Sequence, residues 1–237
     1  EFKQWFLPLT LRVDYYRIAT KGSEQITFDA MYEEGTWPGS RTVLVDTLNL
    51  GDNLFTVRDR ETGKLLTSRG FSTLCGEWQT TEEAVTSWRT FHETVRFPFP
   101  KKSVIVSFFK RDSIVGKGKP MAFRKIQEFT LDPQDSIRVR RYRPANTFKV
   151  YDVLNNGPCE KKVDILIVGD GYALSDREKF KADVQHFTET LFSVYPFSKH
   201  KKDFNVRAIE VISEESGIDK PDIHVWKNNI LGTQYNT

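Results

Sequence analysis

The most constraining feature of this sequence is a short apolar run followed by a glycine turn, a helical pattern and a second apolar run. Five of the six residues from Val163 to Val168 are apolar and do not alternate with polar ones, which is typical of a strand buried on both faces. Gly169 and Gly171 follow this run, and glycine tolerates the positive φ of a tight turn. The order predicts a β-α-β unit with parallel strands and a right-handed crossover.

The segment between the two runs predicts one amphipathic helix. Ser175 and Glu178 have the spacing of a capping box, in which two side chains satisfy free N–H groups at a helix start. One helical face is apolar and comprises Phe180, Val184, Phe187 and Leu191. Tyr195-Pro196 ends the helix, and the second strand runs from Phe204 to Ile212.

The first part of the chain has the pattern of short β-strands. Ile26, Phe28, Ala30 and Tyr32 alternate with polar residues, as expected for a strand with one solvated face. Similar runs begin near Leu11, Val43, Leu54, Leu65, Phe91, Val104 and Phe123. Asp59–Lys64 has the composition of a hairpin turn with Gly63 at positive φ, and Thr80–Ala84 predicts a helical turn. Seven or eight strands between Leu9 and Leu131 predict a β-sandwich.

A boundary between two domains is expected after this part. The residues Asp132–Pro144 are polar and contain four arginines, Arg138, Arg140, Arg141 and Arg143. Such a cluster can bind phosphate or an acidic ligand, but no aromatic stacking set surrounds it. We therefore favour an exposed strand or linker whose arginines pair with nearby carboxylates. The predicted domains are residues 1–143 and 148–237.

Composition excludes several classes of protein. The net charge of +3 over 237 residues is too small to indicate nucleic-acid binding by itself, and no apolar run reaches the ~18 residues of a membrane span. Cys75 and Cys159 cannot form a zinc motif by themselves, and two free or buried thiols are favoured over a disulfide. The chain opens on Glu1 without a methionine, so we expect a mature or trimmed product.

The glycine turn is the best-placed candidate for chemistry. Gly169-Asp170-Gly171 follows a strand of parallel type, where α/β proteins bind ligands. Asp170 could act as a ligand or general base, although an Asp at this place more often caps the helix or bonds within its own turn. The four histidines have no i, i+4 pair of the kind that binds a metal. The residues by themselves therefore reveal no complete catalytic constellation.

Several stretches together resemble the M64 metallopeptidases, the IgA-peptidase family. The residues 70–84 and 91–101 resemble the amino-terminal domain of that family. The residues 163–172 resemble the opening of its peptidase domain. Further matching stretches are residues 180–184, Pro196-Phe197, 204–206, 215–217 and 226–232.

The resemblance implies a secreted or cell-envelope zinc endopeptidase, multi-domain in organisation, with an all-β sandwich followed by an α/β, zincin-like catalytic domain. In such enzymes a His-Glu-x-x-His helix supplies two zinc ligands and a general base. This motif is absent here, since His92-Glu93 is followed by Thr94-Val95-Arg96. We therefore assign no catalytic residue and no zinc ligand to this chain, and we expect it to be inactive alone.

The α/β part is expected to be incomplete. One helix cannot cover both faces of a parallel sheet, and the residues expected to lack packing partners are Ile165, Ile167, Val206 and Ile209. The remainder of the same polypeptide would complete this domain and carry the zinc ligands. The partner implied by the resemblance is a protein or peptide substrate, not nucleic acid. The candidates for the substrate cleft are Gly169, Asp170, Gly171, Tyr172, Asp219 and Trp226.

Two other classes of function stay open at this point. One is a non-catalytic β-sandwich that binds glycan or protein through Trp37, Trp78 and Trp88, although aromatic residues of this kind are often buried in a core. The other is an α/β hydrolase or nucleotide-binding domain built around the glycine turn, which has the least support because the dinucleotide fingerprint requires a further glycine.

Overall fold

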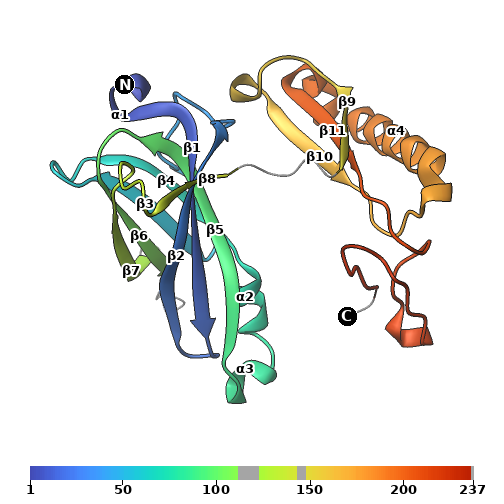
Figure 1. The fold of residues 1–237 in the computed structure, drawn as a ribbon, viewed down its shortest axis with the longest axis horizontal. Helices are drawn as coiled ribbons and strands as arrows, with labels where there is room; N and C mark the ends of the chain where they lie inside the picture. The colour runs from blue at the N-terminus through green and yellow to red at the C-terminus, as the bar shows by residue number, and fades with distance from the viewer. Residues whose placement is uncertain (112–122, 143–147, 236–237) are drawn as a thin grey trace. The chain divides into compact units, whose positions relative to one another are not determined.

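The computed structural model describes residues 1–111, 123–142 and 148–235. Contacts divide the chain into two compact units, Glu1–Arg143 and Pro144–Thr237 (Figure 1). Each unit is described by itself. None of the helices in the described ranges combines the length and the apolar character that a membrane crossing requires.

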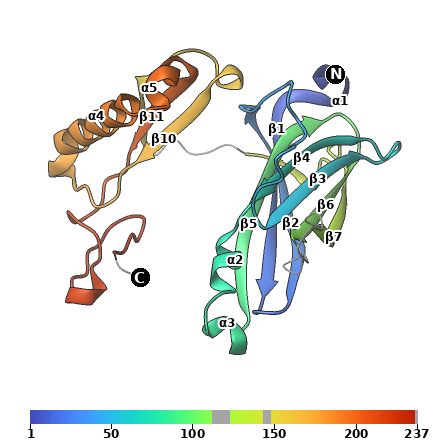
Figure 2. The ribbon, with the colours of Figure 1, turned by 180° about the vertical axis from the view of Figure 1, so that it is seen from behind.

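The first unit is built almost entirely of strands. They are β1 (Phe6–Ala19), β2 (Glu24–Thr36), β3 (Asn53–Asp59), β4 (Leu65–Phe71), β5 (Arg89–Pro100), β6 (Val104–Arg111), β7 (Phe123–Leu131) and β8 (Val139–Arg141). Its described residues also form three short helices, α1 (Phe2–Trp5), α2 (Leu74–Trp78) and α3 (Glu83–Thr86). The strands form two four-stranded sheets with the orders β5-β1-β2-β8 and β4-β3-β6-β7, which Figure 2 shows as separate layers.

One hydrophobic core joins the two sheets. Aromatic rings meet across the layers, with the Tyr15 ring of β1 4.7 Å from the Phe108 ring of β6 and the Phe55 ring of β3 6.2 Å from the Phe97 ring of β5. Leu11, Val13 and Tyr15 alternate along β1 and are fully buried in this core, as one inward face of a strand requires. The mostly β prediction for this part of the chain is confirmed, and the arrangement is compatible with the predicted sandwich.

A charged side chain is buried at one end of this core. Arg17 of β1 is 1% exposed, and its Nε lies 2.9 Å from Glu93 Oε2 while its Nη1 lies 2.6 Å from Glu24 Oε2. Lys110 Nζ lies 3.8 Å from the other oxygen of Glu24. Two cations therefore neutralise two carboxylates, which is the condition for keeping charges out of water.

Most sequence predictions for local structure in the first unit are confirmed, with one correction. Gly63 has φ +70° in the hairpin between β3 and β4, as predicted. A helical turn forms at Glu83–Thr86, close to the predicted one. The run at Val43 is not a strand, because only Val45 makes a bridge, to Ser68, and Val43 is exposed.

The arginine cluster makes ion pairs within its own unit. Arg138 Nε lies 3.6 Å from Asp135, and Arg141 Nε lies 3.4 Å from Glu33. Arg140 lies over the ring of Tyr32 at 6.0 Å. The pairs of Arg138 and Arg141 agree with the favoured interpretation of an exposed strand or linker whose arginines pair with carboxylates, and Arg140 contacts an aromatic ring instead. Arg143 lies outside the described residues.

The second unit contains the predicted β-α-β unit and one additional strand. Its elements are β9 (Lys149–Leu154), η1 (Cys159–Lys161), β10 (Val163–Val168), η2 (Leu174–Asp176), α4 (Arg177–Ser193), α5 (Phe197–His200), η3 (Lys201–Asp203), β11 (Phe204–Glu210) and η4 (Pro221–Ile223). β10 and β11 are parallel, from the pair Val163↔Phe204 to the pair Val168↔Ile209, as predicted. β9 pairs antiparallel with the other side of β11, so β11 is the central strand.

Helix α4 covers one face of this three-stranded sheet (Figure 1). Phe180 and Val184 are buried against Ala208, as the amphipathic pattern predicts. The prediction for Phe187 is wrong, because this side chain is 55% exposed, and Thr188 and Phe192 are the buried residues instead. The buried face therefore repeats every four residues, since a single helix that packs on a sheet presents a narrow stripe.

The prediction that β10 is buried on both faces is also wrong. Val163, Leu166 and Val168 are 54%, 57% and 44% exposed, because β10 is an edge strand of the described sheet and α4 lies on one face only. Ile165 and Ile209 are partly exposed, as expected for an incompletely covered sheet. Ile167 differs from the expectation, because it packs against the cluster of Phe180, Val184 and Ala208. Val206 is an exception and is fully buried, because it lies on the central strand under α4.

The start of α4 differs from the predicted capping box. Ser175 lies inside the short helix η2 and not at the start of α4. Asp176 accepts a hydrogen bond from Ala173 N at 3.0 Å, and Glu178 pairs with Lys181 at 2.7 Å. The N-cap of α4 is therefore Asp176, one residue later than the Ser175 that the sequence pattern indicates.

We predict that Arg17→Ala destabilises the first unit by about 3–5 kcal/mol, because it leaves the Glu93 carboxylate without its cation and the Glu24 carboxylate with Lys110 alone. The matched control is Arg58→Ala, which removes an exposed side chain of β3 that donates to Gly63 O and should cost less than about 0.5 kcal/mol. Urea unfolding of each variant measures the difference. Similar unfolding free energies for both variants would contradict the importance of the buried network.

Candidate functional site

The turn after β10 is fixed by close packing of two glycine-containing segments. Gly171 has φ +71°, and its N–H group and carbonyl are both engaged, the carbonyl accepting from Gly217 N at 2.8 Å. A Cβ atom on Gly171 would lie 2.4 Å from the carbonyl oxygen of Gly217. Glycine is therefore required here both for its backbone conformation and for the close approach of the second segment.

Asp170 ties this turn to residues distant in the sequence. Its carboxylate accepts hydrogen bonds from Gly171 N at 2.9 Å, Ser213 Oγ at 3.2 Å, Leu231 N at 3.3 Å and Thr233 N at 3.1 Å. Burial works to raise the pKa of Asp170, but the hydrogen bonds from Thr233, Leu231 and Gly171 outweigh it and hold the pKa below its ordinary value.

Asp170 is therefore an ionised tether between two segments. The expectation that it bonds within its own turn is confirmed by the contact with Gly171, whereas it does not cap α4. A carboxylate with four donors is a poor general base, because those hydrogen bonds stabilise its charged form.

Tyr172 connects the same turn to α4. Its hydroxyl donates to Asp183 Oδ2 at 2.9 Å, and its ring lies 5.0 Å from the ring of Phe180. Burial, followed by the hydrogen bond to Asp183, raises the pKa of Tyr172. Lys179 also contacts Asp183. The hydrogen bond from Lys179 lowers the pKa of the Asp183 carboxyl more than the hydrogen bond from Tyr172 does.

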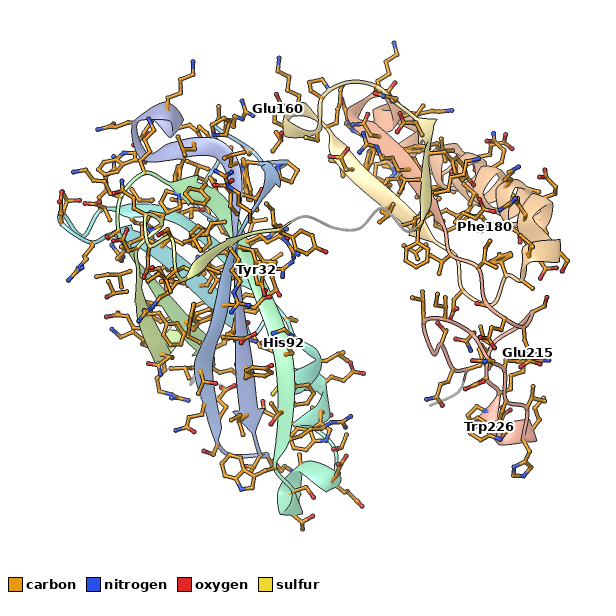
Figure 3. The ribbon with its side chains drawn as sticks, in the orientation of Figure 1. Tyr32, His92, Glu160, Phe180, Glu215 and Trp226 are labelled. Atoms are coloured by element: carbon orange, nitrogen blue, oxygen red, sulfur yellow. The ribbon has the colours of Figure 1, made fainter. Side chains whose placement is uncertain are left out.

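The two remaining predicted site residues lie in the loop that Asp170 tethers. Asp219 Oδ1 accepts from Lys227 N at 2.6 Å, and Asp219 N donates to Thr233 O at 3.2 Å. Trp226 is 62% exposed and lies in the same loop (Figure 3). The structure thus links Asp219 to the glycine turn through Thr233, whereas the Trp226 side chain makes no hydrogen bond to the turn among the described residues.

A cavity of about 440 Å³ lies beside this turn, between β10 and α4. Its lining combines Val168, Gly169, Asp170 and Tyr172 with Asp183, His186, Phe187 and Thr190 of α4. Sequence analysis missed these four α4 residues as a group, because it placed Phe187 on the apolar face of the helix and assigned no role to the other three. Their spacing of 0, 3, 4 and 7 residues defines a second helical face and was the available signal.

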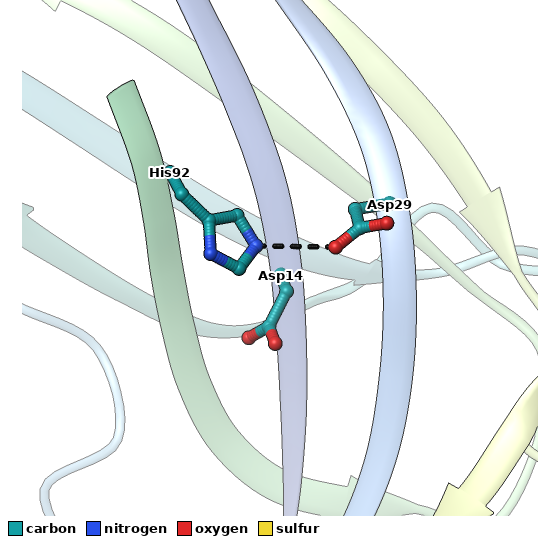
Figure 4. Close-up of side chains that lie close together, drawn as sticks. All are labelled: Asp14, Asp29 and His92. Carbon is teal, nitrogen blue, oxygen red and sulfur yellow. Dashed lines mark hydrogen bonds and ion pairs between the residues drawn. The ribbon is translucent and has the colours of Figure 1, made fainter. Parts of the chain in front are cut away.

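In the part of the chain that the structure describes, one group of three side chains has ligand atoms close enough to hold a metal ion. Asp14, Asp29 and His92 have such atoms within 4.8 Å of one another on neighbouring strands (Figure 4). His92 Nε2 lies 3.1 Å from Asp29 Oδ2, and the His92 ring stacks on Tyr16. The Asp14 carboxylate already accepts from Arg12 at 3.0 Å and from Thr94 at 2.8 Å.

This group is a polar network and a poor cation site. The Arg12 guanidinium neutralises Asp14 and repels a second cation at the same carboxylate.

Both cysteines are free, Cys75 being buried, and burial raises the pKa of the Cys75 thiol to about 11, which makes that thiol unreactive near neutral pH.

Comparison with protein families places both units among peptidases. A family described as Peptidase M64 N-terminus matches residues 1–117, and a family described as IgA Peptidase M64 matches residues 151–237. The chain belongs to the M64 family of metallopeptidases. A search of curated proteins finds no match to this chain.

A metallopeptidase implies a metal ion, and the described residues do not provide a suitable site for it. The group around His92 lies in the part matched by the N-terminus family, and Arg12 occupies one of its carboxylates. We therefore derive no catalytic step through a metal held by these residues.

We predict that Gly171→Ala destabilises the protein more than Gly63→Ala does. Both glycines have φ near +70°, so each substitution carries the ~1–2 kcal/mol cost of a left-handed non-glycine residue. Only at Gly171 does the new methyl group meet a backbone oxygen, since nothing lies within 4 Å of the corresponding position at Gly63. Urea unfolding measures both losses, and equal losses would contradict the close approach of Gly217.

We predict that Asp170→Asn releases the segment that carries Leu231 and Thr233. The folded-state pKa of Asp170 is lowered, so its contribution is fully present above the unfolded pKa of about 3.9 and is lost as the pH falls through the folded pKa. Amide hydrogen exchange at Leu231 and Thr233, corrected for intrinsic rates, should accelerate in wild type on acidification. In Asp170→Asn it should be fast already at pH 7.

The exposed Asp222→Asn serves as the control and should behave like wild type. Protection of Leu231 and Thr233 that survives Asp170→Asn at pH 7 would show that other contacts hold this segment.

Proposed function

We propose that this chain forms the accessory β-sandwich and the first β-α-β portion of a zincin-like catalytic domain in a secreted or cell-envelope zinc endopeptidase. The observation that carries the proposal is the parallel β10-α4-β11 unit within the residues matched by the IgA Peptidase M64 family. A two-sheet unit precedes it, in the residues matched by the M64 N-terminus family. The order of the two units along the chain is thus the same as the order of the two family matches.

Within this chain, the carboxyl end of β10 would lie closest to the site of peptide hydrolysis. The turn Gly169–Tyr172, the tethered loop and the cavity lined by Phe187 surround this strand end, which is where ligands bind in α/β sheets. β10 pairs only with β11 among the described strands, so its outer edge can donate and accept main-chain hydrogen bonds. The role of these residues is to bind and position a polypeptide, and Asp170 holds the turn in shape.

The uncovered face of the second unit supports the proposal that further polypeptide of the same enzyme completes the domain. Val150, Leu166 and Val168 are each between 44% and 57% exposed, and their strand positions place them on the face opposite α4. A sheet face with several exposed aliphatic side chains is costly in water. A second covering layer on this face would remove that cost.

The alternative of a binding module that uses three tryptophans receives little support. Trp78 is 6% exposed and donates to Glu83, so it belongs to a core. Trp37 donates to Ser40 O within its own loop and packs against the main core. Trp88 is the one of the three that is largely exposed.

The test is chelator-sensitive proteolysis by the natively expressed protein. We expect cleavage of an unfolded protein substrate, loss of that cleavage after treatment with a chelator, and recovery when zinc is added back. Metal analysis of the same preparation should find about one zinc per molecule. Cleavage that is insensitive to chelator, or a native protein without zinc and without activity, would contradict the proposal.

A further inference from the structure

The outer edge of β5 is open along the half of the strand that lines a cleft of the first unit. β5 is the last strand of its sheet and pairs only with β1 among the described strands (Figure 1). The pairing runs without a bulge from Ala19↔Arg89 to Thr10↔Pro98. Among the described residues, no hydrogen bond joins the main chain of residues 89–94 to a segment other than β1. Such an edge exposes alternate N–H and C=O groups with which another strand can pair.

Two other edges of these sheets are covered by the chain itself. The edge of β4 is covered by the loop of residues 44–46, because Ser68 N donates to Leu44 O at 3.2 Å and Gly70 N donates to Asp46 Oδ2 at 2.8 Å. Part of the edge of β2 pairs with β8.

The two halves of β5 differ in their protection. Pro98 and Pro100 have no N–H group, so the second half of the strand is a poor template for pairing. Residues 89–94 contain no proline and no lysine, which are the common means of blocking an edge. Proline protection is therefore absent where β5 lines the cleft.

The cleft beside this edge has a preformed apolar wall. Its volume is about 510 Å³, and it lies between residues 89–94 and residues 71–74. The Phe91 ring is supported by the Trp78 ring at 5.6 Å, and the Phe71 ring by the Phe55 ring at 6.1 Å. Leu74 belongs to the same lining and is 73% exposed. An apolar side chain next to the open edge would therefore find a wall that needs no rearrangement.

The charges of the lining favour an acidic partner. Glu93 is paired with Arg17, whose Nε lies 2.9 Å from Glu93 Oε2, so its charge is neutralised from within the protein. Arg89 has an exposed side chain and pairs with Glu83 at 3.7 Å, while that same Glu83 oxygen accepts from Trp78 Nε1 at 2.9 Å. An exposed pair at this distance contributes little. The guanidinium of Arg89 can therefore donate to a second carboxylate.

We propose that this edge binds an extended segment of another protein as an added strand. The main chain of the segment pairs with residues 89–94, an apolar side chain packs on Phe71 and Phe91, and a carboxylate of the segment accepts from Arg89. Main-chain pairing provides affinity, and the apolar wall and the guanidinium provide selectivity. The inference does not depend on the proposed peptidase activity.

A second copy of β5 fits this edge less well than an acidic segment does. Arg89, His92 and Arg96 would come from both copies, and like charges on paired strands destabilise the pairing. The acidic residue of the strand, Glu93, is already engaged by Arg17. Charge complementarity therefore selects a different polypeptide as the occupant.

The test measures binding of fluorescent seven-residue peptides that alternate Val with Ser and carry Asp at one end. Fluorescence anisotropy follows binding to the full chain, with a chelator present so that proteolysis does not consume the peptide. Two further peptides carry N-methyl groups on either the odd or the even amides. Only one of these sets faces β5 in an added strand, so we expect one methylated peptide to bind about tenfold more weakly and the other to bind unchanged.

The variant Arg89→Gln tests the charge of the lining. It should weaken the Asp peptide about fivefold and leave a peptide with Ser in place of Asp unchanged, because it removes one exposed charge pair. The matched control is Arg96→Gln, since Arg96 belongs to the same strand but not to the lining of this cleft. This control should bind the Asp peptide like wild type, and thermal unfolding verifies that both variants are folded.

Four results would overturn the proposal. The absence of binding by every peptide would leave the edge without a polypeptide ligand. Equal binding of the two methylated peptides would exclude pairing with β5. Binding of the Asp peptide that Arg89→Gln leaves within twofold of wild type would exclude the carboxylate contact. A concentration-dependent dimer that the peptides dissociate, measured by sedimentation, would assign the edge to a second copy. None of these results bears on chelator-sensitive proteolysis.

Discussion

The parallel pairing of β10 with β11 determines where the candidate site lies. Two parallel strands joined by a helix end at the same edge of their sheet, so the turn after Val168 comes to lie beside the residues that follow β11. Ser213 and Asp170 meet for this reason, although 43 residues separate them. The charge of Asp170 then draws the amides of Leu231 and Thr233 to the same place. The strand pairing brings this loop to the turn, and the hydrogen bonds of the Asp170 carboxylate hold it there.

The first unit depends on a different physical constraint, the burial of a core between two sheets. Two sheets bury a common core, and aromatic rings such as Tyr15 and Phe108 meet between them. At one end of this core the side chain on β1 is Arg17, not a hydrophobic residue. Its burial is tolerated because Glu24 and Glu93 accept its hydrogen bonds. A core closed by an ionic network retains polar atoms that an apolar core does not have.

The comparison with known families and the geometry address different questions. The family assignment covers both units and identifies a metallopeptidase. The geometry shows which residues of this chain are structural, because Asp170 is held by four donors and Asp14 by Arg12 and Thr94. Neither carboxylate is available for the proton transfer that peptide hydrolysis requires. At the end of β10 the geometry shows a cavity that one face of α4 lines.

Sequence patterns predicted the elements of the site but not its contacts. The apolar run, the two glycines and the helix were all visible, because hydrophobic periodicity and backbone freedom are local properties. The partners of Asp170 could not be predicted, since a hydrogen bond between residues 61 or 63 positions apart depends on how the loop folds back. The sequence also could not show that Phe192 is buried while Phe187 is exposed. Both fit an amphipathic helix, and only the sheet beneath α4 selects one.

By itself the sequence determined a strand-rich first part, a parallel β-α-β unit, an exposed arginine-rich strand or linker and the membership in a peptidase family. Those properties follow from periodicity, composition and motif order, which each segment carries independently of the rest. The tertiary structure alone decided that β10 is an edge strand among the described strands, that Asp170 is a tether and that Arg17 is buried between Glu24 and Glu93. These features depend on which surfaces pack together in the folded chain, because burial and hydrogen bonds between distant residues arise only from that packing.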